Sequence, residues 1–270
     1  MRRLLVAMIA AVVMSLFAVQ AQAITNGEPD HGRHPYVGLM VADAEIDGEV
    51  QPAWRCSGSL LSPTVFLTAG HCTDGATAVR VWFAEDVQSN TEYPFSGATS
   101  YEGTPDTHPG YCTAPCGPGL PGFAHRDVGI VVLREPVPPS VVSQYAALPA
   151  AGLVDTLPGQ ADVTLVGYGV QERVRGGGPP VWAGLRVRLM APARLVSGQF
   201  THSDEFIRVT ASPGQGGGTC FGDSGGPILN DDANTVVAVT SYGTNINCAG
   251  VGYAARIDLA DVLAWIRSFL

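Results

Sequence analysis

One serine in the C-terminal half of the chain stands in a glycine-rich setting. Residues 217–229 read GGTCFGDSGGPIL, so Ser224 follows an acid and has glycines on both sides. A serine attacks a carbonyl only when a base removes its proton and fixed donors stabilise the oxyanion that forms. Glycines allow the backbone to approach a substrate closely, and the N–H groups of Gly222 and Ser224 would donate to one oxyanion. The segment therefore predicts nucleophilic acyl transfer.

A histidine and an aspartate elsewhere in the chain are suited to activate this serine. His71 lies at the end of the apolar run VFLTAGHC and precedes a cysteine that would hold its backbone. Asp127 begins the apolar run RDVGIVVL, where an unpaired acid is costly to bury. Taken singly, a histidine such as His71 is more often a surface or structural residue, and Asp127 is as readily a strand-start or turn aspartate. With Ser224, they supply a base, an orienting acid and a nucleophile.

The bulk composition indicates an exported, strand-rich protein. Only 14% of the 270 residues are charged, while there are 33 glycines and 20 prolines, which is typical of a turn-rich β protein. Residues 1–23 combine a basic start, an apolar run and the small-residue pattern Ala21-Gln22-Ala23, which predicts a signal peptide. No later stretch is long and apolar enough to span a membrane. We therefore expect a secreted, extracellular protein without membrane contact after signal removal.

The charge balance limits the classes of partner. The formal net charge of −9, without a basic patch, argues against nucleic acid. The acidic stretch DAEIDGE (43–49) is interpreted as a solvated loop, because its carboxylates do not follow the helix–loop–helix calcium pattern. We expect no cofactor, no metal and a monomer.

Six cysteines in an exported chain indicate disulfides, because export carries them to an oxidising compartment. Spacing alone does not choose among the possible pairings. Only the spacing of Cys112 and Cys116 approaches that of zinc ligands, and this alternative is not favoured. In chain order the cysteines are Cys56, Cys72, Cys112, Cys116, Cys220 and Cys248.

Short apolar or β-branched runs recur between clusters of glycine, proline, asparagine and aspartate from Ile24 onward. This spacing is typical of antiparallel sandwiches or barrels. The proline-rich stretch REPVPPS (134–140) is unsuited to a central strand and is the expected crossover between two halves. The terminal stretch DLADVLAWIRSFL (258–270) has apolar residues at helical spacing, which predicts a helix with Asp258 as its N-cap.

Taken together, these segments resemble the trypsin/chymotrypsin-like serine endopeptidases. The resemblance rests on LTAGHC (67–72), RDVGIVVL (126–133) and CFGDSGGPIL (220–229), in the family's order of His, Asp and Ser. Further matching segments, including ITNGEP (24–29) and VGYG (166–169), extend it over residues 24–270. The resemblance implies an all-β fold of two six-stranded antiparallel β-barrels, an active site in the cleft between them, and a C-terminal α-helix.

The domain boundaries follow from the crossover. We expect the signal peptide over residues 1–23 and the N-terminal barrel, carrying His71 and Asp127, over residues 24–138. The C-terminal barrel, carrying Ser224, and the terminal helix would occupy residues 139–270.

The resemblance also implies a role for each candidate residue. Ser224 attacks the scissile carbonyl of a protein or peptide, His71 transfers the proton, and Asp127 orients His71. The implied disulfides are Cys56–Cys72 and Cys220–Cys248. The remaining pair, Cys112 and Cys116, is interpreted as a small local staple in the loop that leads to Asp127.

In this family, activation depends on a freed N-terminal amine that pairs with the acid before the nucleophile. Here these groups are Ile24 and Asp223, and their ion pair would fix the oxyanion loop. The pattern Ala21-Gln22-Ala23 predicts a signal cut directly before Ile24. A cut after Ala21 is the alternative and would leave a two-residue propeptide.

The expected substrate pocket is uncharged. Gly218 stands six residues before the nucleophile, at the base of the family's primary specificity pocket, with Thr219 beside it, so a preference for Arg or Lys is not expected. An alignment that puts Ala254 where an aromatic residue is usual gives Gly252 as one wall; a shift by one residue gives Val251 and a narrower pocket. A rescue of the charge by Glu205, Asp231 or Asp232 is a less favoured alternative. The residues expected along the rest of the pocket are Ser241, Tyr242, Gly243 and Gly252.

The predicted function is that of a secreted serine endopeptidase that acts through an acyl-enzyme after an apolar or aromatic residue. Cleavage after small apolar residues is the alternative that the shifted alignment allows. A catalytically silent binding protein is a second alternative, although no triad residue or loop glycine is lost. An α/β-hydrolase is excluded because its order is Ser, acid, His, whereas here the serine comes last.

Overall fold

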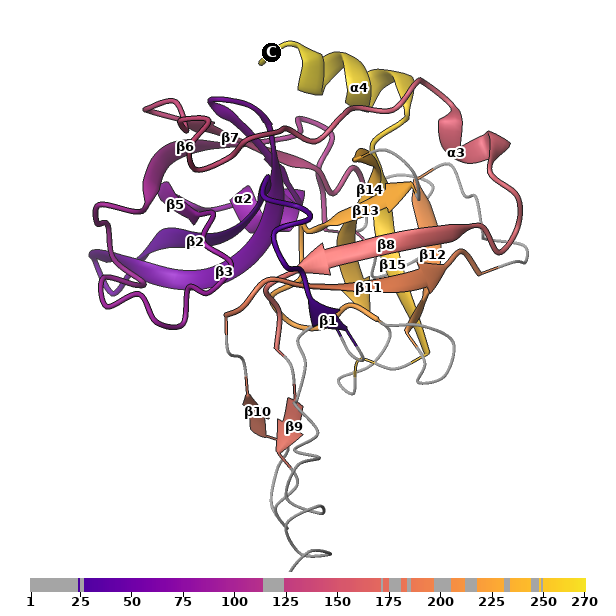
Figure 1. Ribbon diagram of the computed structural model, residues 1–270. Coiled ribbons are helices and arrows are strands. Elements are labelled where there is room, and N and C mark those ends of the chain that lie inside the picture. Colours follow the sequence, from indigo (N-terminus) through magenta and orange to yellow (C-terminus); the bar gives the residue numbers. More distant parts are fainter. Residues whose placement is uncertain are drawn as a thin grey trace, which may run out of the picture.

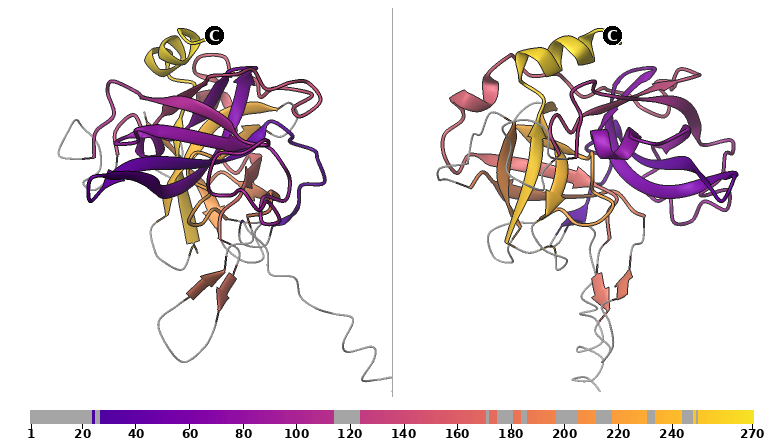
Figure 2. Two further views of the ribbon diagram at one scale, coloured as in Figure 1. Left: turned by 90° about the vertical axis from the view of Figure 1, so that its left-hand side faces the viewer. Right: turned by 180° about the vertical axis from the view of Figure 1, so that it is seen from behind.

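The computed structural model contains two β-rich halves that lie side by side, with the C-terminal helix above them (Figure 1). Both further views keep the two halves apart and adjacent (Figure 2). The predicted signal peptide, residues 1–23, lies outside the described residues. The structure describes residues 24, 27–113, 124–170, 172–174, 181–183, 186–196, 205–211, 218–230, 234–243, 248 and 250–270.

The first half is a closed antiparallel barrel with the strand order β2-β3-β4-β7-β6-β5. Its strands β4 and β7 carry the apolar runs VFLT and GIVVL, which are buried at nearly every position. Large side chains such as Phe66, Trp82 and Ile130 are fully buried in it. The strands are β2 (Val37–Ile46), β3 (Glu49–Ser62), β4 (Val65–Thr68), β5 (Ala78–Trp82), β6 (Tyr101–Thr107) and β7 (Gly129–Leu133).

The second half is a curled antiparallel sheet with the order β1-β11-β8-β13-β14-β15-β12. A bridge between Leu195 and Val209 brings the end of β11 to β12, so the sheet curls back on itself. The short β9 (Glu172–Val174) and β10 (Val181–Ala183) pair only with each other among the described strands. The sheet's strands are β1 (Glu28–Pro29), β8 (Asp162–Gly167), β11 (Leu189–Arg194), β12 (Phe206–Ala211), β13 (Pro227–Asn230), β14 (Thr235–Gly243) and β15 (Gly250–Arg256). The prediction of an all-β fold with two barrels and a terminal helix is confirmed, with β1 as an additional edge strand.

Among the described residues, helical structure is confined to short turns and the end of the chain. The elements are α2 (Gly70–Thr73), α3 (Leu153–Thr156) and α4 (Ala260–Arg267). Helix α4 buries Val262, Leu263 and Ile266 on one face, as the helical spacing predicts. No helix among the described residues is long and apolar enough to cross a membrane.

The predicted N-cap of the terminal helix is wrong. Leu259 occupies that position, and no side chain caps the helix there. Asp258 is fully buried and instead accepts hydrogen bonds from Arg256 Nε and the Val154 N–H, both at 2.9 Å. The reason is that Arg256 is only 3% exposed, so its charge requires a buried counter-ion.

The prediction of a loop over residues 43–49 is also wrong. Strand β2 continues to Ile46 and β3 begins at Glu49, with the register Ile46↔Glu49. The two residues between them, Asp47 and Gly48, have φ of 55° and 83°. An Asp-Gly pair with positive φ favours a tight hairpin, and this turn keeps the acidic stretch in strand pairing.

The segment that follows Ile24 is bound to the second half. Glu28 pairs with Met190 of β11, and the buried Asp30 accepts a hydrogen bond from Arg188 Nε at 2.9 Å. The His34 ring nitrogen Nδ1 lies 2.5 Å from the same carboxylate. Breaking a buried ion pair of this kind costs about 3–5 kcal/mol, so Asp30 fixes the start of the barrel region firmly. The boundary at residues 138 and 139 stays a prediction.

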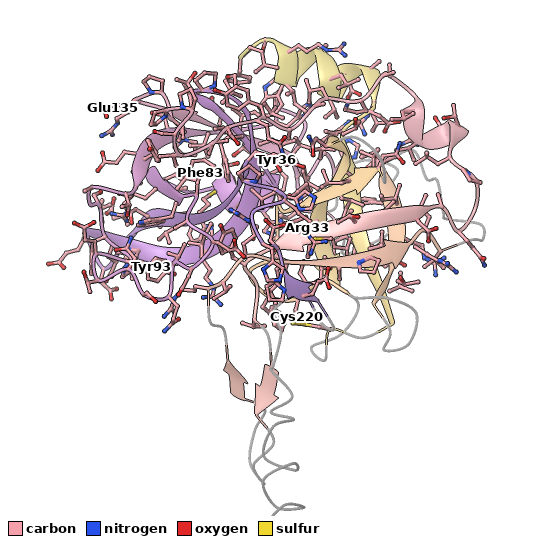
Figure 3. All side chains as sticks on the ribbon, viewed as in Figure 1. Arg33, Tyr36, Phe83, Tyr93, Glu135 and Cys220 are labelled. Carbon is pink, nitrogen blue, oxygen red and sulfur yellow. A yellow bond between two sulfur atoms is a disulfide. The ribbon has the colours of Figure 1, made fainter. Side chains whose placement is uncertain are left out.

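Polar contacts also join the two halves at their junction. The Arg188 guanidinium donates to the carbonyl of Val37 and to the Tyr168 hydroxyl, each at 3.1 Å. Tyr36 lies close to the junction (Figure 3) and donates through its hydroxyl to Asn234 Oδ1 at 3.1 Å. These bonds connect residues far apart in the sequence and hold the halves in one relative position.

Candidate active site

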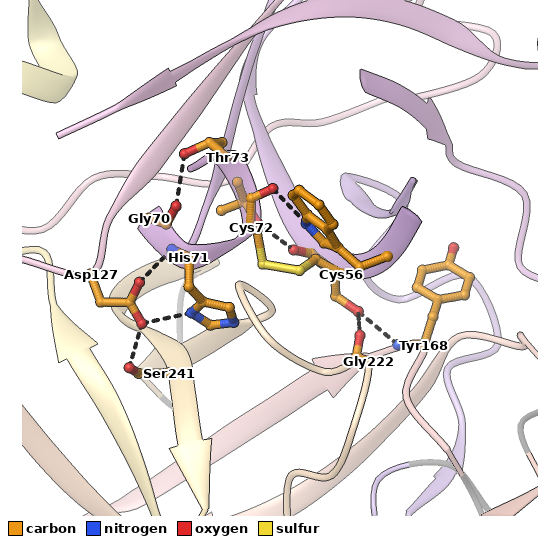
Figure 4. Close-up of a disulfide and its surroundings, with 12 residues drawn as sticks. Cys56, Gly70, His71, Cys72, Thr73, Asp127, Tyr168, Gly222 and Ser241 are labelled. Carbon is orange, nitrogen blue, oxygen red and sulfur yellow. Dashed lines mark hydrogen bonds and ion pairs between the residues drawn. A yellow bond between two sulfur atoms is a disulfide. The ribbon is translucent and has the colours of Figure 1, made fainter. Parts of the chain in front are cut away.

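The first barrel brings His71 and Asp127 together through neighbouring strands. Thr68 at the end of β4 pairs with Gly129 at the start of β7, so the residues just beyond them are adjacent. His71 Nδ1 lies 2.8 Å from Asp127 Oδ2, and the His71 backbone N–H donates to Oδ1 at 2.8 Å (Figure 4). Gly70 is required here because a Cβ would lie 2.7 Å from the Tyr111 ring.

The electrostatics of this pair define the histidine tautomer. A carboxylate only accepts hydrogen bonds, so Nδ1 carries the proton and Nε2 is left as the basic nitrogen. Burial alone would lower the pKa of His71, but the hydrogen bond and charge of Asp127 outweigh it and raise that pKa. Burial alone would raise the pKa of Asp127, but hydrogen bonds from His71 and Ser241 and the His71 charge lower it.

A third donor to Asp127 comes from the second barrel. The Ser241 hydroxyl on β14 donates to Asp127 Oδ2 at 2.5 Å. The sequence placed Ser241 only along the pocket edge and missed this contact. The available signal was chemical: a carboxylate that is 1% exposed needs more than one donor, and a buried hydroxyl supplies one.

The loop that carries Ser224 is pressed against the start of the His71 segment. The Ser57 N–H donates to the Ser224 carbonyl at 2.8 Å, and the Ser57 hydroxyl donates to the Gly222 carbonyl at 2.9 Å. Gly225 has φ of +77°, and a Cβ on it would lie 2.0 Å from Thr68 Oγ1 and 2.7 Å from the Ala69 nitrogen. Only glycine fits this approach, which brings the loop of the half-buried Ser224 against Thr68 and Ala69, the residues that precede the His71 turn.

Two backbone donors in this loop remain available. The N–H groups of Asp223, Gly225 and Gly226 bond to the carbonyls of Cys220, Thr240 and Asp223. Within the part of the chain that the structure describes, the N–H groups of Gly222 and Ser224 have no acceptor. Gly222 has φ of +94°, a conformation that L-residues with side chains avoid. Two such donors two residues apart can bind one anionic oxygen.

The carboxyl of Asp223 is fully buried and has only backbone donors. It accepts N–H groups from Gly169 at 2.8 Å and from Cys220 at 2.9 Å, and among the described residues it forms no ion pair. Burial raises the pKa of this carboxyl to about 7, although both N–H donors and the charge of Arg55 act in the opposite direction. Ionised Asp223 is therefore short of a cation.

The structure has disulfides between Cys56 and Cys72 and between Cys220 and Cys248. The sulfur atoms of Cys56 and Cys72 lie within 4.8 Å of a His71 ring nitrogen, but they are bonded to each other and are not thiolate ligands for a metal. Cys112 is disulfide-bonded, while Cys116 lies outside the described residues.

The expected pocket residues meet at the edge of the second barrel. Gly243 of β14 pairs with Gly252 of β15, and on the other side of β15 Gly252 pairs with Val209 and Val251 with Thr210 of β12. A Cβ on Gly252 would lie 3.0 Å from Thr219 Oγ1. Gly218 and Thr219 are buried, Gly243 is exposed, and the Tyr242 ring stacks on Tyr253 with centroids 5.0 Å apart.

The acids considered as a rescue of the pocket charge have other positions. Glu205 lies 2.5 Å from His125 Nδ1 and 3.8 Å from Arg126 NH1, so its charge is engaged there. Asp231 and Asp232 lie outside the described residues.

Arg126, directly before Asp127, has a strained backbone. Its φ of +46° costs a residue with a side chain about 1–2 kcal/mol. Its guanidinium Nε donates to Asp261 of α4 at 2.8 Å, in addition to the Glu205 contact. Acids from the second half therefore hold the residue that sets the direction of Asp127.

The comparisons agree with this fold. The family model described as Trypsin matches residues 24–266. Serine protease 1 of Drosophila melanogaster is 29% identical over 90% of this chain and 84% of its own length. Brachyurin of Leptuca pugilator is 31% identical over 81% of this chain and 89% of its own length.

Solved structures show the same fold. HL collagenase superposes with a TM-score of 0.66 at 20% identity, covering 91% of this chain and 97% of that one. A mutant of human heparin binding protein (CAP37) gives 0.63 at 16% identity, covering 91% and 96%. A two-barrel β fold with a histidine, a buried aspartate and a glycine-framed serine defines a protease class. The chain belongs to the trypsin family and is a trypsin/chymotrypsin-like serine endopeptidase.

Two substitutions of Arg126 separate the effect of its charge from the effect of its strained backbone. Arg126→Ala and Arg126→Gly both lose the ion pairs, but only alanine keeps the cost of positive φ, about 1–2 kcal/mol. Glycine loses more chain entropy on folding, roughly 0.5–1 kcal/mol, which offsets part of that gain. We expect R126G to be more stable than R126A by up to about 1 kcal/mol in urea denaturation and to retain more activity. An R126A variant more stable than R126G would contradict the strain; Arg194→Ala, an exposed arginine paired with Asp162, is the control.

Proposed function

We propose that this chain is a secreted endopeptidase that cleaves proteins through an acyl-enzyme on Ser224, with His71 as base and Asp127 as orienting acid. The observation that carries the proposal is the buried Asp127 carboxylate, which holds His71 at both the backbone and the ring nitrogen. The Ser224 loop supports it, because Gly225 packs on Thr68 and Ala69, immediately before the His71 segment. Removal of residues 1–23 as a signal peptide accompanies secretion.

The chemistry proceeds in two halves. Ser224 Oγ attacks the scissile carbonyl while His71 Nε2 takes its proton, and Asp127 stabilises the imidazolium that forms. The oxyanion accepts the N–H groups of Gly222 and Ser224, each worth about 3 kcal/mol in the transition state. The leaving amine takes the proton from His71, and a water then hydrolyses the acyl-enzyme by the same route.

The acyl side chain of the substrate occupies the pocket formed by Gly218, Thr219, Gly243 and Gly252. None of these residues is charged, so the pocket favours an apolar or aromatic side chain over Arg or Lys. Gly252 gives the pocket its width, because the space next to Thr219 is left open by the absence of a Cβ.

Activation follows from the buried Asp223. Ile24 is fully buried within the core of the second barrel, together with Val163 and Leu165 of β8. The same strand ends at Gly167, where a Cβ would lie 2.3 Å from Asp223 Oδ1. Cleavage before Ile24 creates an ammonium group on the barrel that holds Asp223, and their ion pair fixes the oxyanion loop.

The triad is tested by covalent labelling. A fluorophosphonate should modify Ser224 of the mature chain and fail with Ser224→Ala, since only an activated hydroxyl reacts. Asp127→Asn should lower kcat roughly 10⁴-fold, because the amide favours the wrong histidine tautomer. Ser89→Ala, at an exposed serine bonded to Asp86, should label normally. A wild-type chain that is folded but resists labelling would indicate a silent binding protein instead.

The pocket is tested by cleavage of a mixed peptide library. We expect cleavage after Phe, Tyr or Leu. Gly252→Val should lower kcat/KM for cleavage after aromatic residues roughly tenfold relative to cleavage after Ala, because the new side chain meets Thr219. Val209→Ala is the matched control for packing, because a Cβ on Gly252 would lie 3.4 Å from the Val209 side chain, at ordinary contact distance. A clear preference of the wild-type chain for Arg or Lys would overturn the assignment of the pocket.

Activation predicts a pH-dependent stability that differs between two forms. In a chain extended before Ile24, the folded pKa of Asp223, about 7, lies above the ordinary aspartate value of 3.8. Ionisation of this acid therefore lowers the free energy of unfolding. The loss begins near pH 4 and is complete above pH 7, where it amounts to about 4 kcal/mol. In the chain that begins at Ile24, the ammonium group pairs with the carboxylate and removes this loss.

The measurement is denaturation of both forms at pH 5 and pH 8, with N-terminal sequencing of each. The extended form should lose stability between these values while the mature form does not, and peptide hydrolysis should be confined to the mature form. Asp223→Asn should abolish the difference in the extended form. An extended form with full activity and the same pH dependence would refute the ion pair.

A further inference from the structure

A half-buried arginine lies against the oxyanion loop. Arg55 is in β3, directly before Cys56, which is bonded to Cys72 beside His71. A Cβ built on Gly222 would lie 3.2 Å from Arg55 Nε and 3.8 Å from its NH2 group, so the guanidinium runs along this glycine. The cation is therefore within a few ångströms of a backbone donor that the proposed mechanism uses.

This guanidinium has no protein partner in the region that the structure describes. It forms no hydrogen bond or ion pair there, and its nitrogens are not among the buried polar atoms. The nearby Asp223 senses its charge but is fully buried and bonded to backbone N–H groups. Other arginines do have carboxylate partners: Arg33, Arg80, Arg126, Arg134, Arg188, Arg194 and Arg256. Arg55 is thus a free, partly desolvated cation at the site.

The position of Arg55 relative to His71 indicates which part of a substrate it meets. Figure 4 shows Ser241 and Gly222 on opposite sides of His71. In the proposed function, the acyl half of a substrate lies along β14, from Ser241 toward Gly243 of the pocket. The other half, which leaves first, therefore extends over Gly222 and the Cys56–Cys72 disulfide, where Arg55 stands.

We propose that Arg55 is a specificity-determining residue that binds a carboxylate in the leaving half of the substrate, an Asp or Glu in the first two residues after the scissile bond. This inference rests on the proposed peptidase function. Two extended residues span about 7 Å, which matches the reach of a guanidinium that lies beside Gly222. A guanidinium binds a carboxylate with two parallel hydrogen bonds, and its planar charge favours this over an amide.

The test uses quenched peptides with one acyl half and Glu, Gln or Lys at each of the first two positions after the bond. The mature wild-type chain should cleave the Glu peptides with a kcat/KM roughly three- to tenfold above the Gln peptides, and the Lys peptides more slowly still. The preference should shrink as salt is added, because the pair is partly exposed.

Three variants separate charge from structure. Arg55→Gln should equalise the Glu and Gln peptides, and Arg55→Glu should reverse the order in favour of Lys. Arg55→Lys should retain a weaker preference for Glu. Arg134→Gln, an exposed arginine of the same barrel that pairs with Glu102, should keep the wild-type order.

An ester with the same acyl half and a small alcohol leaving group separates recognition from damage to the loop. Its leaving group does not reach Arg55, so R55Q should lose far more on the Glu peptide than on the ester. An equal loss on both would overturn the inference, since it would mean that Arg55 only supports the Gly222 loop.

The remaining outcomes are also decisive. A Glu preference that persists in R55Q, or an active wild-type chain without any preference, would overturn the role of Arg55 and leave the peptidase function standing. A wild-type chain that cleaves no peptide and takes no fluorophosphonate label would contradict the peptidase function, and this inference with it.

Discussion

Burial of the Asp127 carboxylate is the constraint on which the site depends. At 1% exposure this group has essentially no water, so its donors must come from the protein. Two come from His71 in the first barrel and one from Ser241 in the second. A single buried charge is therefore satisfied only when both barrels are in place, which makes the direction of the His71 ring a property of the whole fold.

Other buried acids along the same junction are satisfied in different ways. Asp30 has the buried Arg188 and the ring of His34, so its charge is balanced within the folded chain. Among the described residues, Asp223 has only backbone N–H donors, and burial raises its pKa to about 7. Buried ion pairs contribute little net stability, but a broken pair is costly, so such groups fix geometry more than they add free energy. This contrast is consistent with Asp30 holding the start of the barrel region in place at all times and with the proposed pairing of Asp223 only after cleavage before Ile24.

Sequence reasoning succeeded where local pattern determines structure. The apolar runs before His71 and after Asp127 identify two buried strands, and the terminal run identifies α4, because each signal lies within a few residues. It failed where one side chain meets another across the fold. The Ser241–Asp127 bond joins residues 114 positions apart, and Asp258 was read as a cap because its true counter-ion, Arg256, has no pattern that marks it as buried. The 43–49 hairpin does have a local signal, the Asp47-Gly48 turn, which the interpretation as a solvated acidic loop left out.

In the proposed function, the pocket and Arg55 select substrates by different physical interactions. The proposed uncharged pocket, framed by Gly218 and Gly252, would bind through apolar area, which separates similar side chains by only about 1–3 kcal/mol for each methylene. Such a pocket leaves many bonds in a protein open to cleavage. A cation without a protein partner acts differently, because it distinguishes charge and attracts substrate over several ångströms. The chain has a net charge of −9, so its acids repel an acidic substrate, and in the proposed role Arg55 offsets that repulsion beside Gly222.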